Sequence, residues 1–288
     1  MSKVLQCIVG MIVYCIALAM PAMAQQTKFT LDDPCAQKLG SIDKSQWLQN
    51  LPVAGNDIYD AENLTRYQQM ARSVLAELIN IDTTDADGDN TAAAEAVAAR
   101  FHKAGFAAGD IEILSPAPRK GNLIVRLRGS DARCAPLLLL AHLDVVPADR
   151  ASWDRDPFSF VEEDGYMYGR GVSDDKDEAA IHIVNLLRLW TEGFKPRRDI
   201  VMALTSDEEG GAHNGVQWLL KEHSELLQAA VVFSEGGSGI LFAGERQAIE
   251  VQTTEKGYQT FELIFESAGG HSSMPPRDNA IVTAGEAM

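Results

Sequence analysis

The sequence has too few basic side chains to balance its acidic ones. Its 25 Lys and Arg stand against 41 Asp and Glu, which gives a formal net charge of −16. Such a chain repels phosphate backbones, so nucleic acid is excluded as a natural partner. Long apolar runs are also scarce, because after residue 24 no segment is long and apolar enough to span a membrane.

Residues 1–24 have the pattern of an export signal. Lys3 is the only charge, Val4 to Met20 is almost wholly apolar, and Pro21 to Ala24 offers a small-residue cleavage site. We expect an exported, periplasmic or secreted protein whose mature chain begins at Gln25. A retained membrane anchor is the alternative, because the apolar core is near the lower length limit for a spanning helix.

Cysteine is scarce as well. Cys7 and Cys15 lie within the expected signal, which leaves Cys35 and Cys134. An oxidising compartment permits these two to pair, but two cysteines so far apart leave the disulfide open. Neither lies in a Cys-x-x-Cys motif or in a nucleophile-like context.

The chain from residue 25 divides into an irregular part and a periodic part. Scattered proline, glycine and polar residues predict an extended lead-in over residues 25–57. Apolar spacings of three and four then predict helices over 64–79, 91–103, 179–190 and 216–220. The alternating acids of 85–90 suggest a calcium loop, but they lack the closing Glu of an EF-hand, so a loop capping the next helix is preferred.

Short aliphatic runs predict the strands. Leu137 to Val146 is apolar until His142 and Asp144, which is typical of a strand buried on both faces. We predict further strands over 111–114, 122–128, 200–204 and 230–233, the last also buried, and a hairpin over 160–168 that turns at Asp164-Gly165. The fold class is therefore α/β, a mostly parallel sheet flanked by helices.

Three of the predicted strands are followed by residue types that commonly bind metals. His142 and Asp144 follow the first, Glu208 and Glu209 follow the strand 200–204, and Glu235 follows the strand 230–233. The carboxyl ends of parallel strands meet at one edge of the sheet, so these side chains would converge with Asp174 from a neighbouring loop.

Carboxylates gathered in a partly dry cleft repel one another unless a cation holds them. One His with Asp and Glu suits zinc, with cobalt or manganese as alternatives, and a bridging carboxylate would place two ions close together. Adjacent Glu208 and Glu209 diverge, so one is expected to be a ligand and the other a general base. The alternative is that these residues are surface acids that terminate strands.

Four segments carry a family resemblance: 137–146, 169–176, 205–210 and 233–236. Together they resemble the signature of the zinc exopeptidases and deacylases, which include carboxypeptidase G, aminoacylase, acetylornithine deacetylase, succinyl-diaminopimelate desuccinylase and carnosinase. The resemblance runs from about Leu64 to the end of the chain.

The resemblance implies roles for individual residues. It makes His142 and Glu235 ligands of one ion, Asp174 the bridge between two ions, and Glu209 a ligand of the second. Glu208 becomes the general base that activates water, and Asp144 the carboxylate that orients His142. A cis peptide between Asp174 and Asp175 is also implied.

The resemblance divides residues 58–288 into two parts. Residues 58–253 would form the metal-binding catalytic domain, and 254–288 the start of an inserted α+β lid or dimerisation domain, compatible with a homodimer. Gly269-Gly-His271-Ser-Ser resembles the motif whose histidine polarises the scissile carbonyl. A turn histidine is the alternative for His271.

The chain departs from the family in two places. Asp177-Glu178 stands after Lys176 where the family usually has a small residue, which adds charge near the metals. The chain also stops where 279–288 begins a predicted helix, before the family's last histidine ligand and its substrate-binding arginine. We therefore expect either a fragment or a protein whose second metal site is incomplete.

We therefore expect a metal-dependent hydrolase that cleaves an amide bond in small peptides or N-acyl amino acids. Its context resembles the carboxypeptidase and dipeptidase branch more than the biosynthetic deacylases. The rival hypotheses are a truncated, inactive metal-binding fragment or interaction protein, and a structural surface protein without metal.

Overall fold

The computed structural model describes Cys35 and residues 63–236, 239–242, 245–249, 261–271, 273–274, 276 and 279–287. The expected signal and, apart from Cys35, the expected lead-in lie outside these residues. The chain divides into two compact units, which are treated separately below: Phe29–Val251, and Met1–Lys28 with Gln252–Met288.

The larger unit is built on a five-stranded sheet of order β1-β2-β6-β3-β7. Its strands are β1 (Ile111–Leu114), β2 (Asn122–Leu127), β3 (Leu137–His142), β6 (Ile200–Thr205) and β7 (Val231–Phe233). β3 pairs in parallel with β6 and β7, whereas β2 is antiparallel to both β6 and β1. Among these strands β2 alone runs against the rest, which confirms the predicted mostly parallel sheet.

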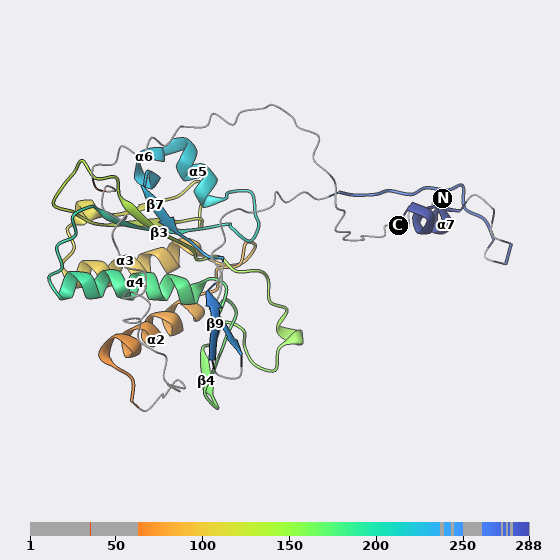
Figure 1. The fold of residues 1–288 in the computed structure, drawn as a ribbon. Coiled ribbons are helices and arrows are strands. Elements are labelled where there is room, and N and C mark those ends of the chain that lie inside the picture. Colours follow the sequence, from red (N-terminus) through yellow and green to blue (C-terminus); the bar gives the residue numbers. More distant parts are fainter. Residues whose placement is uncertain are drawn as a thin grey trace. The chain divides into compact units, whose positions relative to one another are not determined.

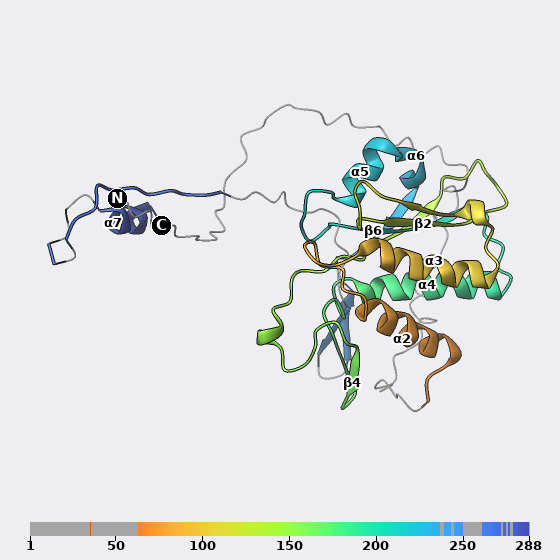
Figure 2. The same cartoon turned by 180° about the vertical axis from the view of Figure 1, so that it is seen from behind.

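Both faces of the sheet are covered (Figures 1 and 2). Helices α3 (Asn90–Ala104) and α4 (Lys176–Thr191) cover one face, with α2 (Arg66–Ile79) packed against α4. Helices α5 (Gly215–Glu222) and α6 (Ser224–Leu227) cover the other face. Side chains alternate along each strand, so Met202 and Leu204 join the core under α2–α4 and Val201 and Ala203 join the core under α5 and α6. Burial of both sets explains the unbroken apolar runs in the sequence.

The connections place the helices on opposite faces. The chain passes from β3 to β6 through α4 and then back across β3 to β7 through α5 and α6. Right-handed crossovers that run in opposite directions put their helices on opposite faces of a sheet. The carboxyl ends of β3, β6 and β7 consequently share one edge, where the loops are free to form a site.

The loop before α3 has the capping role expected of it. The Asp89 carboxylate accepts the Ala92 N–H at 3.0 Å, and the helix ends at Gly105, whose φ is +93°. The N-terminus of α2 has a capping box between Thr65 and Gln68.

The predicted burial of the strand 230–233 is wrong. Val231, Val232 and Phe233 are 47%, 51% and 52% exposed. The reason is that β7 is an edge strand of the sheet, paired on one side with β3 in the part of the chain that the structure describes. An aliphatic run alone does not distinguish a central strand from an edge strand.

The remaining elements are short. The predicted hairpin is β4 (Val161–Glu163) and β5 (Tyr166–Tyr168), and a second pairs β8 (Gly239–Phe242) with β9 (Glu245–Ile249). Short 3-10 helices, η2 and η3, span Ala108–Asp110 and Arg150–Ser152, and the smaller unit contains the predicted C-terminal helix, α7 (Ala280–Ala287). Within the described ranges, no helix has the length and apolarity needed to cross a membrane.

A disulfide joins Cys35 to the buried Cys134, so the pairing that the sequence left open is present. Because it closes a loop of 99 residues, the double change Cys35→Ser/Cys134→Ser should lower the free energy of unfolding by about 2–4 kcal/mol. Denaturant unfolding with and without reductant measures this, and reductant should leave the double variant unchanged. Equal stability of both proteins would show that the bond is not stabilising.

Candidate functional site

The site forms around the imidazole of His142 at the carboxyl end of β3. The residue is only 3% exposed. Its Nε2 lies 3.1 Å from Asp174 Oδ1, 3.6 Å from Glu235 Oε2 and 3.9 Å from Glu208 Oε2. Side chains that follow β3, β6 and β7 thus meet with one from the loop before α4, as predicted.

Three of these groups fit a metal ion. One donor atom each from His142, Asp174 and Glu235 lie within 4.8 Å of one another. Bonds of about 2.0–2.2 Å at tetrahedral angles place neighbouring ligand atoms roughly 3.4 Å apart, which the 3.1 and 3.6 Å separations bracket. The donor set and its spacing therefore suit a small divalent cation such as zinc.

The orientation of His142 is fixed by its neighbours. Nδ1 is 3.0 Å from the carbonyl oxygen of Asp144, and the backbone N–H donates to Asp175 Oδ2 at 3.1 Å. A neutral ring that donates from Nδ1 to a carbonyl keeps the lone pair of Nε2 for the carboxylate side of the site. Nε2 is therefore the ring nitrogen that can bind a metal ion.

Asp144 contacts both His142 and Glu209. Its carboxylate is buried, with Oδ1 3.6 Å from His142 Nδ1 and Oδ2 accepting the N–H of Glu209 at 2.9 Å. The backbone carbonyl of Asp144 is the closer partner of the ring. The side chain thereby links the loop after β3 to the loop after β6.

Asp175 and Lys176 belong to the site, although the sequence analysis gave them no role. The peptide between Asp174 and Asp175 is cis, as the resemblance implied. Asp175 is buried, and burial raises the pKa of its carboxyl to about 7 against the lowering effect of the His142 N–H. Their place in the Asp-Asp-Lys motif beside Asp174 is the signal that could have identified them.

Lys176 anchors the start of α4. It is fully buried, and its Nζ donates to the carbonyls of Leu78 and Ile81 at 2.9 and 3.0 Å. Burial lowers the pKa of this ammonium to about 7. These bonds tie the end of α2 to the loop that carries Asp174.

The pKa values of the site reflect the close packing of its acidic side chains. Burial, with neighbouring carboxylates, raises the pKa of both Glu208 and Glu209. Burial of His142 opposes protonation, but hydrogen bonding to Asp144 and the charges of Asp144 and Asp175 outweigh it and raise the pKa of His142 to about 10. The metal-free site therefore holds protons where a cation would bind.

Glu209 and His271 are the remaining predicted site residues. The backbone N–H of Glu209 donates to Asp144. Its side chain is not one of the three clustered donors, although the negative charge of Asp174 helps to raise its pKa. His271 is exposed in the smaller unit, where its Nδ1 accepts the N–H of Ser273 at 3.3 Å.

Part of the chain is similar to known proteins. The sequence model of Peptidase family M20/M25/M40 matches residues 138–273. The N-fatty-acyl-amino acid synthase/hydrolase PM20D1 of Xenopus tropicalis is 40% identical over 162 residues, which are 55% of this chain and 32% of that protein. Carboxypeptidase S of Saccharomyces cerevisiae is 36% identical over 172 residues, 57% of this chain and 30% of that protein.

A solved structure shares the fold. The M20 family metallo-carboxypeptidase Sso-CP2 from Sulfolobus solfataricus matches with a TM-score of 0.50 at 21% identity, over 59% of this chain and 38% of that one. In each comparison the match spans well under half of the other protein.

Metal binding should release a proton from His142. With a pKa of about 10, above its ordinary 6.5, His142 is protonated at neutral pH, so an ion must displace that proton. The apparent affinity for Zn²⁺ should rise by up to about tenfold per pH unit from neutral pH towards pH 10. Competition with a chelating dye across this range measures the slope, and a flat profile would contradict the prediction.

Proposed function

We propose that this chain, which carries a Peptidase family M20/M25/M40 domain, is a metal-dependent hydrolase that cleaves an amide bond in a small peptide or N-acyl amino acid. The convergence of Asp174, Glu235 and Glu208 on Nε2 of His142 is the observation that carries the proposal. This convergence brings the proposed metal ligands and the proposed carboxylate base together around one histidine nitrogen.

The metal is proposed to be zinc, with His142, Asp174 and Glu235 holding the first ion. Asp174 would also face a second ion together with Glu209, whose backbone is fixed by Asp144. When bound, a divalent ion would acidify water and polarise the substrate carbonyl. Asp174 and Glu235 are about half exposed, so substrate can approach them from solvent.

Glu208 is proposed as the general base. Its carboxylate lies 3.9 Å from His142 Nε2, close to the proposed ligands but outside the cluster of three. A pKa raised by burial and by the charges of Glu235 and Asp144 makes Glu208 a better proton acceptor than an ordinary glutamate. It would take a proton from the attacking water and return it to the leaving amine.

His271 is proposed to stabilise the negative charge that develops on the substrate oxygen. Its Nδ1 lies 2.8 Å from the hydroxyl oxygen and 3.3 Å from the backbone nitrogen of Ser273, so Nε2 is the ring nitrogen that would donate to the substrate. The assignment otherwise rests on the Gly-Gly-His-Ser-Ser motif. A homodimer through residues 254–288 is likewise a proposal.

Two relatives suggest the substrate class. One is named for N-fatty-acyl-amino acid hydrolysis and the other as a carboxypeptidase. Both reactions cleave an amide that carries an amino acid on its amine side. We propose the same bond here, with the acyl or peptidyl group left open.

Substitution of Glu235 and of Glu208 should distinguish a metal ligand from a general base. Glu235→Gln should lose bound zinc, whereas Glu208→Gln should keep it and lower kcat by about 10²–10⁴-fold, because only the proton acceptor is removed. Elemental analysis and hydrolysis of an N-acyl amino acid and a blocked dipeptide measure both effects.

Glu222→Gln is the matched control, because Glu222 pairs with the exposed Lys221. Full activity in Glu208→Gln would reject the assigned base. Absence of zinc in the unaltered protein would reject the metal site, and zinc without hydrolysis would favour a metal-binding fragment.

Export is proposed from residues 1–24, and the Cys35–Cys134 disulfide supports it because such bonds persist in oxidising compartments. Mass spectrometry of the chain expressed in a bacterial host should show a mature start at Gln25. An intact chain beginning at Met1 would favour the membrane-anchor alternative.

A further inference from the structure

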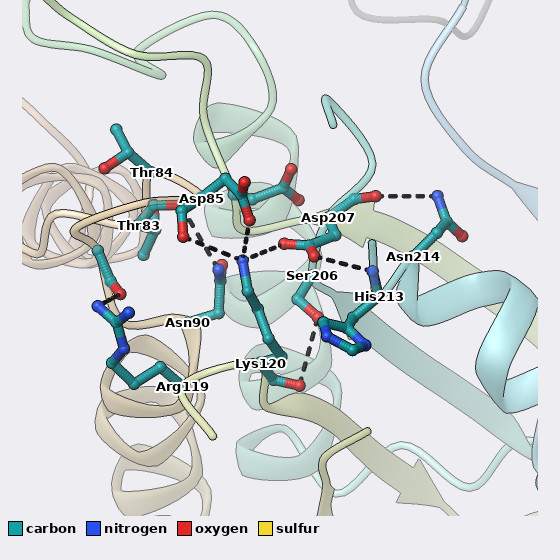
Figure 3. Close-up of polar contacts among 12 residues, drawn as sticks. Thr83, Thr84, Asp85, Asn90, Arg119, Lys120, Ser206, Asp207, His213 and Asn214 are labelled. Carbon is teal, nitrogen blue, oxygen red and sulfur yellow. Dashed lines mark hydrogen bonds and ion pairs between the residues drawn. The ribbon is translucent and has the colours of Figure 1, made fainter. Parts of the chain in front are cut away.

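Lys120 lies just before β2 and was not identified by any sequence motif. It is 7% exposed, although it carries a charge. Its Nζ lies 2.6 Å from Asp207 Oδ1 and 2.5 Å from Asp85 Oδ1, and it also contacts the carbonyl of Asp85 at 3.3 Å. Figure 3 shows the ammonium between the two carboxylates, which come from different loops.

Asp207 directly precedes the pair Glu208 and Glu209. Its φ is +56°, a left-handed conformation that few residues other than glycine adopt. The side chain is fully buried, with Oδ2 accepting the His213 N–H at 3.2 Å and the backbone carbonyl accepting from Asn214 Nδ2 at 3.0 Å. A strained backbone of this kind persists only where its surroundings hold it.

The charge of Lys120 is what permits Asp207 to be buried. A buried carboxylate without a cation is strongly unfavourable. Burial opposes the charge of Lys120, but hydrogen bonds to Asp207 and Asp85 outweigh it and raise the pKa of the ammonium above its ordinary value. The ammonium of Lys120 therefore keeps its charge at neutral pH.

Gly211 shows how closely the two carboxylates pack. A Cβ on this residue would lie 2.4 Å from Asp207 Oδ2 and 2.8 Å from Asp85 Oδ1, so a side chain there would displace them. Asp207 and Asp85 thus leave no room for a side chain at position 211.

The segment after β6 is fixed on both sides of Glu208. Before it, Ser206 N–H donates to Asn122 Oδ1 at 3.0 Å, and Ser206 Oγ donates to the carbonyl of Lys120 at 3.3 Å. After it, the N–H of Glu209 donates to Asp144 Oδ2 at 2.9 Å. The direction of Glu208 is therefore set by Asn122 and Lys120 on one side and, on the other, by Asp144, which also contacts His142.

We propose that Lys120 is a positioning residue: by pairing with Asp207, it holds the left-handed turn that directs Glu208 towards His142 and sets the backbone that leads to Glu209. The roles of Glu208 and Glu209 rest on the proposed function, whereas the control of their backbone by Lys120 does not. Loss of Lys120 should increase the mobility of residues 205–211 while leaving the sheet intact.

The test uses Lys120→Met and the double variant Lys120→Met/Asp207→Asn. The single change leaves a buried carboxylate unpaired and can prevent folding. The double change removes both charges, and Asn tolerates the left-handed conformation. Arg126→Met is the matched control, since Arg126 pairs with Asp199 at 2.7 Å and links β2 to the opposite end of β6.

Hydrogen exchange of peptides covering residues 205–211 is the first readout, because it needs neither metal nor activity. The double variant should exchange there at least about tenfold faster than the unaltered protein, while Arg126→Met should leave the segment unchanged. Equal exchange in the double variant and the control would overturn the proposal.

Kinetics and metal content are the second readout. The double variant should lower kcat or zinc affinity by about 10–100-fold with KM changed far less, a split that general destabilisation in Arg126→Met should not reproduce. Unchanged kcat and zinc affinity would also overturn it. If the unaltered protein lacks zinc and activity, the proposed function fails, and hydrogen exchange alone decides the role of Lys120.

Discussion

The structure depends on the crowding of negative charge around one histidine. Asp174, Glu208 and Glu235 approach Nε2 of His142 within 3.9 Å, while Asp144 and Asp175 lie on its other sides. Without a cation, burial and neighbouring charges raise the pKa of Glu208 and Asp175, and the pKa of His142 rises to about 10. Carboxylates in such numbers are compatible with folding because a positive charge can occupy their centre.

The sheet supplies the rigidity that this crowding requires. Because both of its faces are buried, β3 and β6 are fixed by packing as well as by hydrogen bonds, and His142 and Ser206 leave them at defined points. The opposed crossovers bring β7, and with it Glu235, to the same edge. A site assembled from three strand ends and one helix start thus depends on the whole sheet.

Buried lysines have a complementary part in the same unit. Lys176 binds the carbonyl of Leu78 in the last turn of α2 and that of Ile81 just after the helix, and so steadies the loop that carries Asp174. Lys120 pairs with Asp207 beside Glu208. Each cation lies beneath a loop of the site and not among the proposed ligands. An acidic chain can build such a cluster because its few buried cations lie where the loops need support.

The sequence alone predicted the strands of the main sheet, most of the helices, the mostly parallel arrangement and the residues at its carboxyl edge, because hydrophobic periodicity and strand-end position are local properties. It did not predict α6 or the hairpin of β8 and β9. It could not show that β7 is exposed, that Cys35 pairs with Cys134, or that Asp175 and Lys120 support the site. Exposure depends on which neighbour a strand finds, and the pairing of Lys120 with Asp207 joins residues 87 positions apart. Such contacts carry no local pattern, so only tertiary packing decides them.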